Sequence, residues 1–133
     1  MGQQQLLLLV LAAIIVGISV VVGINMFNSS SDQANIDAVR QDLLTIGSQA
    51  QSWYKRPDMM GGGGNSFSGL DFNKMSFPAD SIDASDPTIA YNSNGDYELS
   101  SVGASSVTAT AIASSAGDTL TATITQNSVN VSG

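Results

Sequence analysis

Residues 6–24 read LLLLVLAAIIVGISVVVGI, and Ser19 is the only polar side chain among them. Nineteen residues at about 1.5 Å each form a helix about 28 Å long, close to the hydrocarbon thickness of a bilayer. The stretch is apolar on all sides, so it is not the amphipathic face of a small soluble domain. We therefore expect a helix that can enter a membrane. It is called the apolar segment below.

The start of the chain differs from a cleavable secretory signal. Such a signal has a basic region, an apolar core of about 7–15 residues and a cleavage site with small residues. Here Met1, Gly2 and three glutamines precede the core without a Lys or Arg, and the core is longer. We therefore expect the apolar segment to belong to the working protein.

A second, amphipathic helical pattern follows the polar residues 28–32. Apolar residues recur in steps of three and four and define one helix face, and this spacing is typical of a helix that packs against a core. Lys55 and Arg56 suit a helix C-terminus, and Pro57 ends the helix. One helix over about 3–54 would span about 78 Å, either continuous or bent and locally melted near residues 23–31. The face that we expect to pack against a sheet consists of Ile36, Val39, Leu43, Ile46, Ala50 and Trp53.

The last third of the chain alternates between apolar and polar residues. Residues 88–91 and 96–99 flank an Asn-Gly turn, and residues 107–113 and 120–125 form a second predicted hairpin, followed by residues 129–131. This pattern predicts an antiparallel sheet of four or five strands. Residues 59–66 are glycine-rich and predict a flexible connector, and residues 67–87 predict a long loop pinned by aromatic residues.

The fold class expected from these patterns is α+β, with a long N-terminal helix packed by a small C-terminal antiparallel sheet. Four parts follow along the chain: an apolar transmembrane or filament-core helix over 1–27, its amphipathic continuation over 28–56, a connector and loop over 57–87, and the sheet domain over 88–133.

The composition excludes several classes of protein. The 133 residues include neither cysteine nor histidine, which rules out disulfides, zinc–thiolate sites, Cys nucleophiles and His-based triads. Four Lys and Arg stand against eleven Asp and Glu, for a net charge of -7. Four cations do not make a nucleic-acid-binding surface. We expect no catalytic residues, no cofactor and no metal, and therefore no enzyme.

This layout resembles the type IV pilin superfamily, with the specific part of the resemblance in the first 54 residues. The resemblance implies a mature chain whose apolar helix lies in the membrane before assembly and in the filament core afterwards. It implies that Met1 is the mature first residue, a leader having been removed; cleavage after Gly2 is the alternative. The family places a Glu at the fifth mature position, where this chain has the uncharged Gln5.

The function expected from the resemblance is that of a structural subunit of an extracellular filament on the cell surface. Its partners would be further copies of itself, the membrane before assembly, and the cellular machinery that assembles pili. The alternative is a single-pass, membrane-anchored surface domain or a minor pseudopilin of a secretion complex.

The helix residues expected to pack in the filament core include two pairs of small residues four apart, Ala13 with Gly17 and Ser19 with Gly23, which allow close helix approach. Small residues are also common in any membrane helix. The full set is Leu6, Leu7, Leu8, Leu9, Val10, Leu11, Ala13, Ile14, Gly17, Ser19, Val20, Gly23 and Ile24.

Three weaker features allow a second interpretation. Asp80, Asp83 and Asp86 could offer oxygen ligands to calcium, but their spacing differs from an EF-hand, and solvated acidic surface is the preferred interpretation. Asn28 and Asn130 fit the N-glycosylation pattern. The candidates for ion pairs between subunits, each contributing at most about 1 kcal/mol, are Asp37, Arg40, Asp42, Lys55, Arg56 and Lys74.

Overall fold

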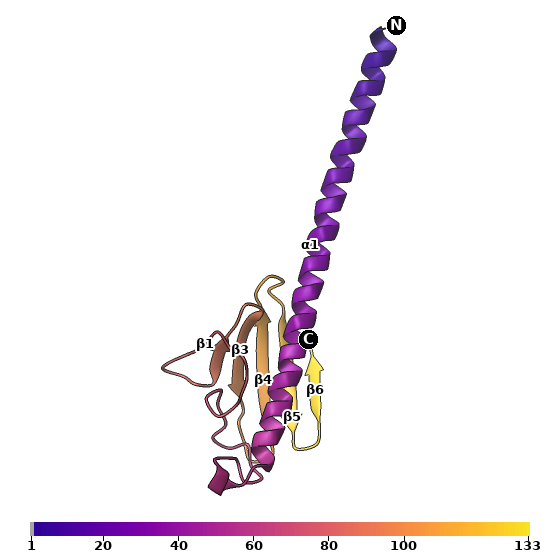
Figure 1. Cartoon of the computed structure of the whole chain (residues 1–133). Coiled ribbons are helices and arrows are strands. Elements are labelled where there is room, and N and C mark those ends of the chain that lie inside the picture. Colours follow the sequence, from indigo (N-terminus) through magenta and orange to yellow (C-terminus); the bar gives the residue numbers. More distant parts are fainter. Residues whose placement is uncertain (1) are drawn as a thin grey trace. The chain divides into compact units, whose positions relative to one another are not determined.

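The computed structural model describes residues 2–133. They form the helix α1 (Gly2–Lys55) and the short 3-10 helix η1 (Asp58–Met60), followed by the strands β1 (Ser81–Ile82), β2 (Ile89–Tyr91), β3 (Gly95–Ser100), β4 (Ser106–Ala113), β5 (Thr119–Thr125) and β6 (Val129–Ser132). The strands form one antiparallel sheet in the order β1-β2-β3-β4-β5-β6 (Figure 1). This arrangement confirms the predicted α+β class. The chain divides into two compact units between Gln33 and Ala34.

α1 is assigned as helix throughout residues 2–55, without the local melting near residues 23–31 that the sequence left open. No proline precedes Pro57, so nothing in the covalent structure interrupts the backbone hydrogen bonds before that point. Lys55 lies in the last turn, where a cation interacts favourably with the partial negative charge of the helix end.

The core of the second unit lies between α1 and one face of the sheet. Val39, Leu43, Ile46 and Ala50 are fully buried there, Trp53 is almost so, and Ile36 is packed at its margin. The sheet supplies alternate residues of β3, β4 and β5, several of them alanines that let the helix approach closely: Tyr97, Leu99, Val107, Ala109, Ala111, Leu120, Ala122 and Ile124.

Gly47 marks the closest approach of α1 to β6. A Cβ placed on Gly47 would lie 2.6 Å from a methyl carbon of Val129. Overpacking of this kind costs about 1–3 kcal/mol, whereas replacing glycine by alanine within a helix gains about 1 kcal/mol. We expect Gly47→Ala to lower the free energy of unfolding by about 1 kcal/mol. In a Val129→Ala background the same substitution should raise it, because the clash is gone.

Chemical denaturation of the full-length chain in detergent micelles, followed through Trp53 fluorescence, measures both effects. A stabilising effect of Gly47→Ala in the presence of Val129 would contradict the close packing of α1 on β6.

The observed strands match the predicted ones within one residue at each end, but the sheet has one strand more than expected. β1 comprises only Ser81 and Ile82, and it pairs with Tyr91 and Ala90 of β2. It lies within residues 57–87, which the sequence predicted to be connector and loop. Two residues are too few to show an alternating pattern, so only the pairing with β2 identifies the strand.

Backbone hydrogen bonds join the glycine-rich stretch, whose composition predicted a flexible connector, to the end of α1. The backbone N–H groups of Gly63, Gly64 and Asn65 donate to carbonyls in the last turn of α1 or just after it, at 2.8–2.9 Å. The loop therefore satisfies carbonyls that the helix end leaves open. A Cβ on Gly63 would lie 2.0 Å from the carbonyl oxygen of Ser66 and 2.6 Å from the Trp53 ring. Close contact is the reason for glycine at this position.

Asp42 joins α1 to the turn between β2 and β3. Its Oδ2 accepts hydrogen bonds from the side-chain amides of Asn92 at 3.1 Å and Asn94 at 2.9 Å, and from the hydroxyl of Tyr97. Asn35 makes a second link, because its amide donates to the Asn94 carbonyl at 2.8 Å. Asp42 thus takes part in bonds within the chain, although the sequence suggested it for ion pairs between subunits.

Ionisation of the Tyr97 phenol makes the stability of the fold depend on pH in the alkaline range. Burial, together with the hydrogen bond to Asp42, raises the pKa of Tyr97 above its ordinary value of 10.0. The folded chain therefore keeps a proton that the unfolded chain loses above pH 10. Stability is unaffected by this group below that pH and falls as the pH rises above it.

We expect the denaturation midpoint of the native chain to drop between pH 9 and pH 11. Tyr97→Phe should show a smaller drop, and an equal drop in both proteins would contradict this origin. Tyr91, whose pKa is also raised by desolvation and by nearby Asp83, should cause a residual dependence.

Candidate assembly surface

The apolar segment of α1 exposes all of its side chains in the isolated chain. Its leucines, isoleucines and valines retain 50–70% of their accessible surface, and Phe27 retains 73%. Residues 2–33 form their own unit and contain no buried residue in the described part. An uninterrupted apolar surface of this extent is far larger than a soluble monomer normally exposes. It therefore needs an apolar surrounding.

α1 is the one helix among residues 2–133 that is long and apolar enough to cross a membrane. By length and composition, the apolar segment can be embedded in a bilayer. Gln3, Gln4 and Gln5 form the first turns of α1 and are exposed. The first turn contains no acidic residue, so Gln5 leaves this end of the helix without a negative side chain.

Polar groups inside the apolar segment are already satisfied by the helix itself. Ser19 is the only polar side chain there, and its hydroxyl donates to the carbonyl of Ile15 at 2.9 Å. The hydroxyl therefore needs no partner from outside, and the segment can be buried in apolar surroundings without losing a hydrogen bond.

The missing side chain of Gly17 leaves a shallow groove along one side of this helix. Gly17 lies at its floor, and a Cβ placed there would meet nothing within 4 Å. Branched side chains form the walls, with Ile14 one turn before Gly17 and Val21 one turn after it. The groove is lined by Ile14, Gly17, Ile18, Val21 and Val22. Such a groove accepts a ridge of side chains from another helix.

The carboxylates of Asp83 and Asp86 accept hydrogen bonds from neighbouring residues of the same loop. Oδ1 of Asp83 accepts hydrogen bonds from the backbone N–H and hydroxyl of Ser85 and from the N–H of Asp86. These bonds, those from Ser85 first, lower the pKa of Asp83. Asp86 in turn accepts from Thr88. Within residues 2–133 no three acidic side chains lie close enough together to hold a metal ion. Turn formation accounts for the positions of these residues.

The remaining predicted residues lie at the surface or in local contacts. Asn28 on α1 and Asn130 on β6 are exposed. Arg40 pairs with Asp37 one turn earlier on α1, at 3.5 Å. Lys74 donates from Nζ to the carbonyl of Gly69 at 2.6 Å and lies 5.8 Å from the centre of the Trp53 ring. Lys55 and Arg56 are exposed.

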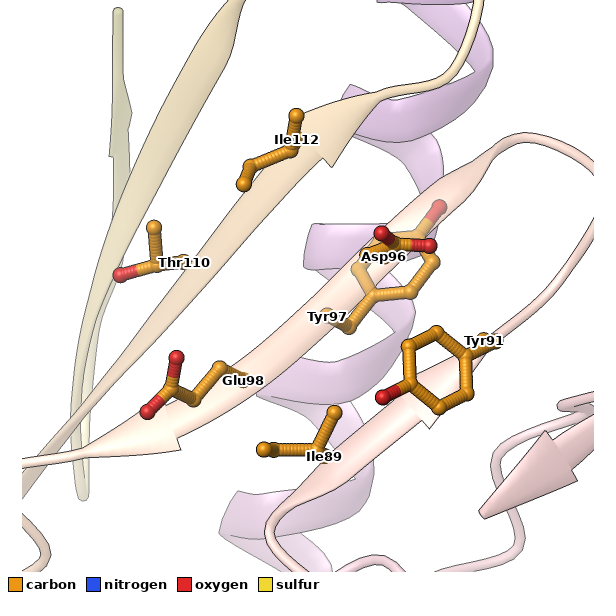
Figure 2. Close-up of a pocket in the computed structure, with 7 residues that line it drawn as sticks. All are labelled: Ile89, Tyr91, Asp96, Tyr97, Glu98, Thr110 and Ile112. Atoms are coloured by element: carbon orange, nitrogen blue, oxygen red, sulfur yellow. The ribbon is translucent and has the colours of Figure 1, made fainter. Parts of the chain in front are cut away.

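The sheet carries a feature that the sequence analysis missed. On the face away from α1, which we call the outer face, a hollow of about 200 Å³ crosses β2, β3 and β4 (Figure 2). Residues paired across the three strands form two rows, which are Tyr91, Asp96 and Ile112, and Ile89, Glu98 and Thr110. Only the register of the strands brings these six side chains together, so no local motif could have revealed them.

A scan against protein-family models and searches of curated proteins and of solved structures found no match to this chain. The long apolar helix and the antiparallel sheet are compatible with a pilin-like fold.

Proposed function

We propose that this chain is a structural subunit that polymerises through its apolar helix into an extracellular filament of the type IV pilus kind. The observation that carries the proposal is the exposure of the whole apolar segment, whose large side chains retain at least half of their surface. A membrane shields this segment before assembly, and neighbouring copies shield it afterwards.

Leaving this large apolar surface in contact with water is energetically unfavourable. Burying a Leu, Ile or Val side chain gains about 1.5–3 kcal/mol. Over the leucines, isoleucines and valines of the segment the gross gain reaches tens of kcal/mol, well above the ordering and association costs that binding must overcome. Identical helices offer the same kind of surface and would lie in the same membrane before assembly.

The geometry of the segment favours packing against copies of itself. The groove at Gly17 leaves room for the side chains of a neighbouring helix, and Ala13 lies one turn before it. Close approach of two helices at small residues is a common mode of association in membranes. A contact between two different surfaces of identical subunits, repeated along a screw axis, produces an open helical polymer.

The second unit is suited to be the outer coat of such a polymer. Among residues 2–133, no buried side-chain nitrogen or oxygen lacks a hydrogen-bond partner. The polar groups inside this unit therefore require no hydrogen-bond partner from another chain. In this proposal it performs no catalysis, and separate cellular machinery moves subunits from the membrane to the filament.

Mechanical shearing of cells that produce the chain tests the proposal. We expect shearing without detergent to release the protein as material that sediments at high speed, and electron microscopy to show filaments in it. Protein that stays with the membrane fraction after shearing, and that detergent releases as single chains, would instead support the anchored surface domain or the minor pseudopilin.

A further inference from the structure

The hollow on the outer face combines apolar walls with two carboxylates. Ile89, Tyr91 and Ile112 form the walls, and Ile112 is 49% exposed. Asp96 and Glu98 are two residues apart on β3, so both side chains lie on the outer face (Figure 2). Both are exposed, and neither carboxylate forms an ion pair or a hydrogen bond within residues 2–133.

This chemistry fits the side chain of Lys or Arg. Such a side chain has an alkyl stem that packs on apolar surface and a charged end that stays near water or an anion. In the hollow the stem would contact Ile112 and the Tyr91 ring, and the cation would reach Asp96 or Glu98. Hydrogen bonds between a cation and a carboxylate are about twice as strong as neutral ones.

The chain itself carries two cations that are available for this role. Of its four basic residues, Arg40 pairs with Asp37, and Lys74 is held by the carbonyl of Gly69. Lys55 and Arg56 are adjacent and exposed, and neither forms an ion pair within the described residues. They form the one adjacent pair of basic residues in the sequence.

Within one chain the sheet separates these two surfaces. α1, which carries Lys55, packs on the inner face, as the hydrogen bond from Tyr97 to Asp42 shows. Asp96 and Glu98 precede and follow Tyr97 on β3 and therefore point the other way. The cations of one chain can meet these carboxylates only on a second copy.

We propose that Lys55 and Arg56 of one copy bind in the outer-face hollow, against Asp96 and Glu98 of a second copy. The inference rests on the proposed function for its partner, and it adds a contact between the sheet domains. The contact joins two different surfaces, so it propagates from subunit to subunit. It also places scarce cations against carboxylates in a chain with a net charge of -7, which lowers the repulsion between copies.

Zero-length cross-linking tests the contact directly, because a carbodiimide joins a lysine to a carboxylate that touches it. The chain has two lysines, Lys55 and Lys74, so the products are few. Full-length chains labelled with heavy and light nitrogen are mixed before assembly, and mass spectrometry identifies mixed-isotope links. We expect Lys55 to be linked to Asp96 or Glu98 of another copy. Absence of this product, or an equal amount with Lys74, would overturn the proposal.

Charge reversal supplies an independent test. Arg56→Glu and Glu98→Lys should each reduce the yield of sedimentable filaments at low salt at least tenfold, and the double variant should return to within about twofold of the native yield. Asp118→Lys is the matched control: Asp118 is exposed and lies outside the hollow. This variant should keep the native yield and should not rescue Arg56→Glu. Unchanged yields, or rescue by Asp118→Lys, would overturn the proposal.

The two proposals can fail separately. A native chain that forms no sedimentable filament contradicts the proposed function. Cross-linking in intact membranes then still decides on the contact: a Lys55 link between copies supports it, and the lack of such a link overturns it. Filaments that form without the link overturn the contact and leave the filament proposal standing.

Discussion

Gly17→Leu is expected to reduce the yield of sheared filaments at least tenfold without releasing the protein from the membrane. The leucine side chain would fill the groove between Ile14 and Val21. Because the distance between packed helices depends on the side chains at the contact, neighbouring copies would be held further apart. Membrane insertion should be unaffected, since leucine is among the residues most favourable within a membrane helix.

Ala12→Leu is the matched control for this substitution. Ala12 lies five residues before Gly17, about 140° around the helix, and it does not line the groove. We expect this variant to keep most of the filament yield. The measurement is the amount of protein in the sheared high-speed pellet, compared with the amount in the membrane fraction. Equal yields from both variants would contradict packing at Gly17.

Asp42→Ala is expected to lower the free energy of unfolding of the second unit by about 3 kcal/mol. Asp42 accepts hydrogen bonds from Asn92, Asn94 and the hydroxyl of fully buried Tyr97. A hydrogen bond to a charged group contributes about 1.5–3 kcal/mol, and a buried hydroxyl left without a partner costs about 1–3 kcal/mol. The three bonds form one network, so their effects are not additive.

Asp37→Ala is the control for Asp42→Ala. Asp37 is an exposed acidic residue on the same helix and pairs with Arg40 three residues on, a type of pair that contributes about 0.2–0.5 kcal/mol. Denaturation of the full-length proteins in micelles compares the two variants. A loss of stability for Asp42→Ala no larger than that for Asp37→Ala would contradict the role of this network.

Local sequence patterns were sufficient to predict most of the fold. The steps of three and four from Ile36 to Trp53 indicated the buried face of α1, because helix geometry alone relates those positions. The alternation of apolar and polar residues indicated the strands, and the Asn94-Gly95 turn marked the first hairpin. Strand and turn geometry also relate residues that are close in sequence. Each of these signals lies within one continuous stretch of the chain.

The features that the sequence did not reveal depend on contacts between residues that are far apart in the chain. Asp42 lies beside the apolar face of α1 and resembles a surface residue in sequence, whereas its partners are 50 to 55 residues away. Gly63 indicated flexibility by composition, but it is held by the carbonyl of Trp53. The outer-face hollow depends on the register of three strands, which no single strand encodes.

The candidate assembly surface could be recognised from the sequence because it depends on composition alone. The apolar segment is continuous in the chain, and its exposure follows from the lack of apolar surface elsewhere to cover it. The mode of packing between copies is different, because it depends on contacts that one chain does not contain. The groove at Gly17 and the charges at Lys55 and Glu98 define where those contacts should be sought.

A three-dimensional electron-microscopy reconstruction of sheared, detergent-free material tests the central claim most directly. The account predicts a helical polymer in which residues 6–24 of neighbouring copies pack side by side along the axis and the sheet domains lie outside them. A reconstruction with the sheet domains at the axis, or material consisting of single chains with residues 6–24 in lipid, would contradict it.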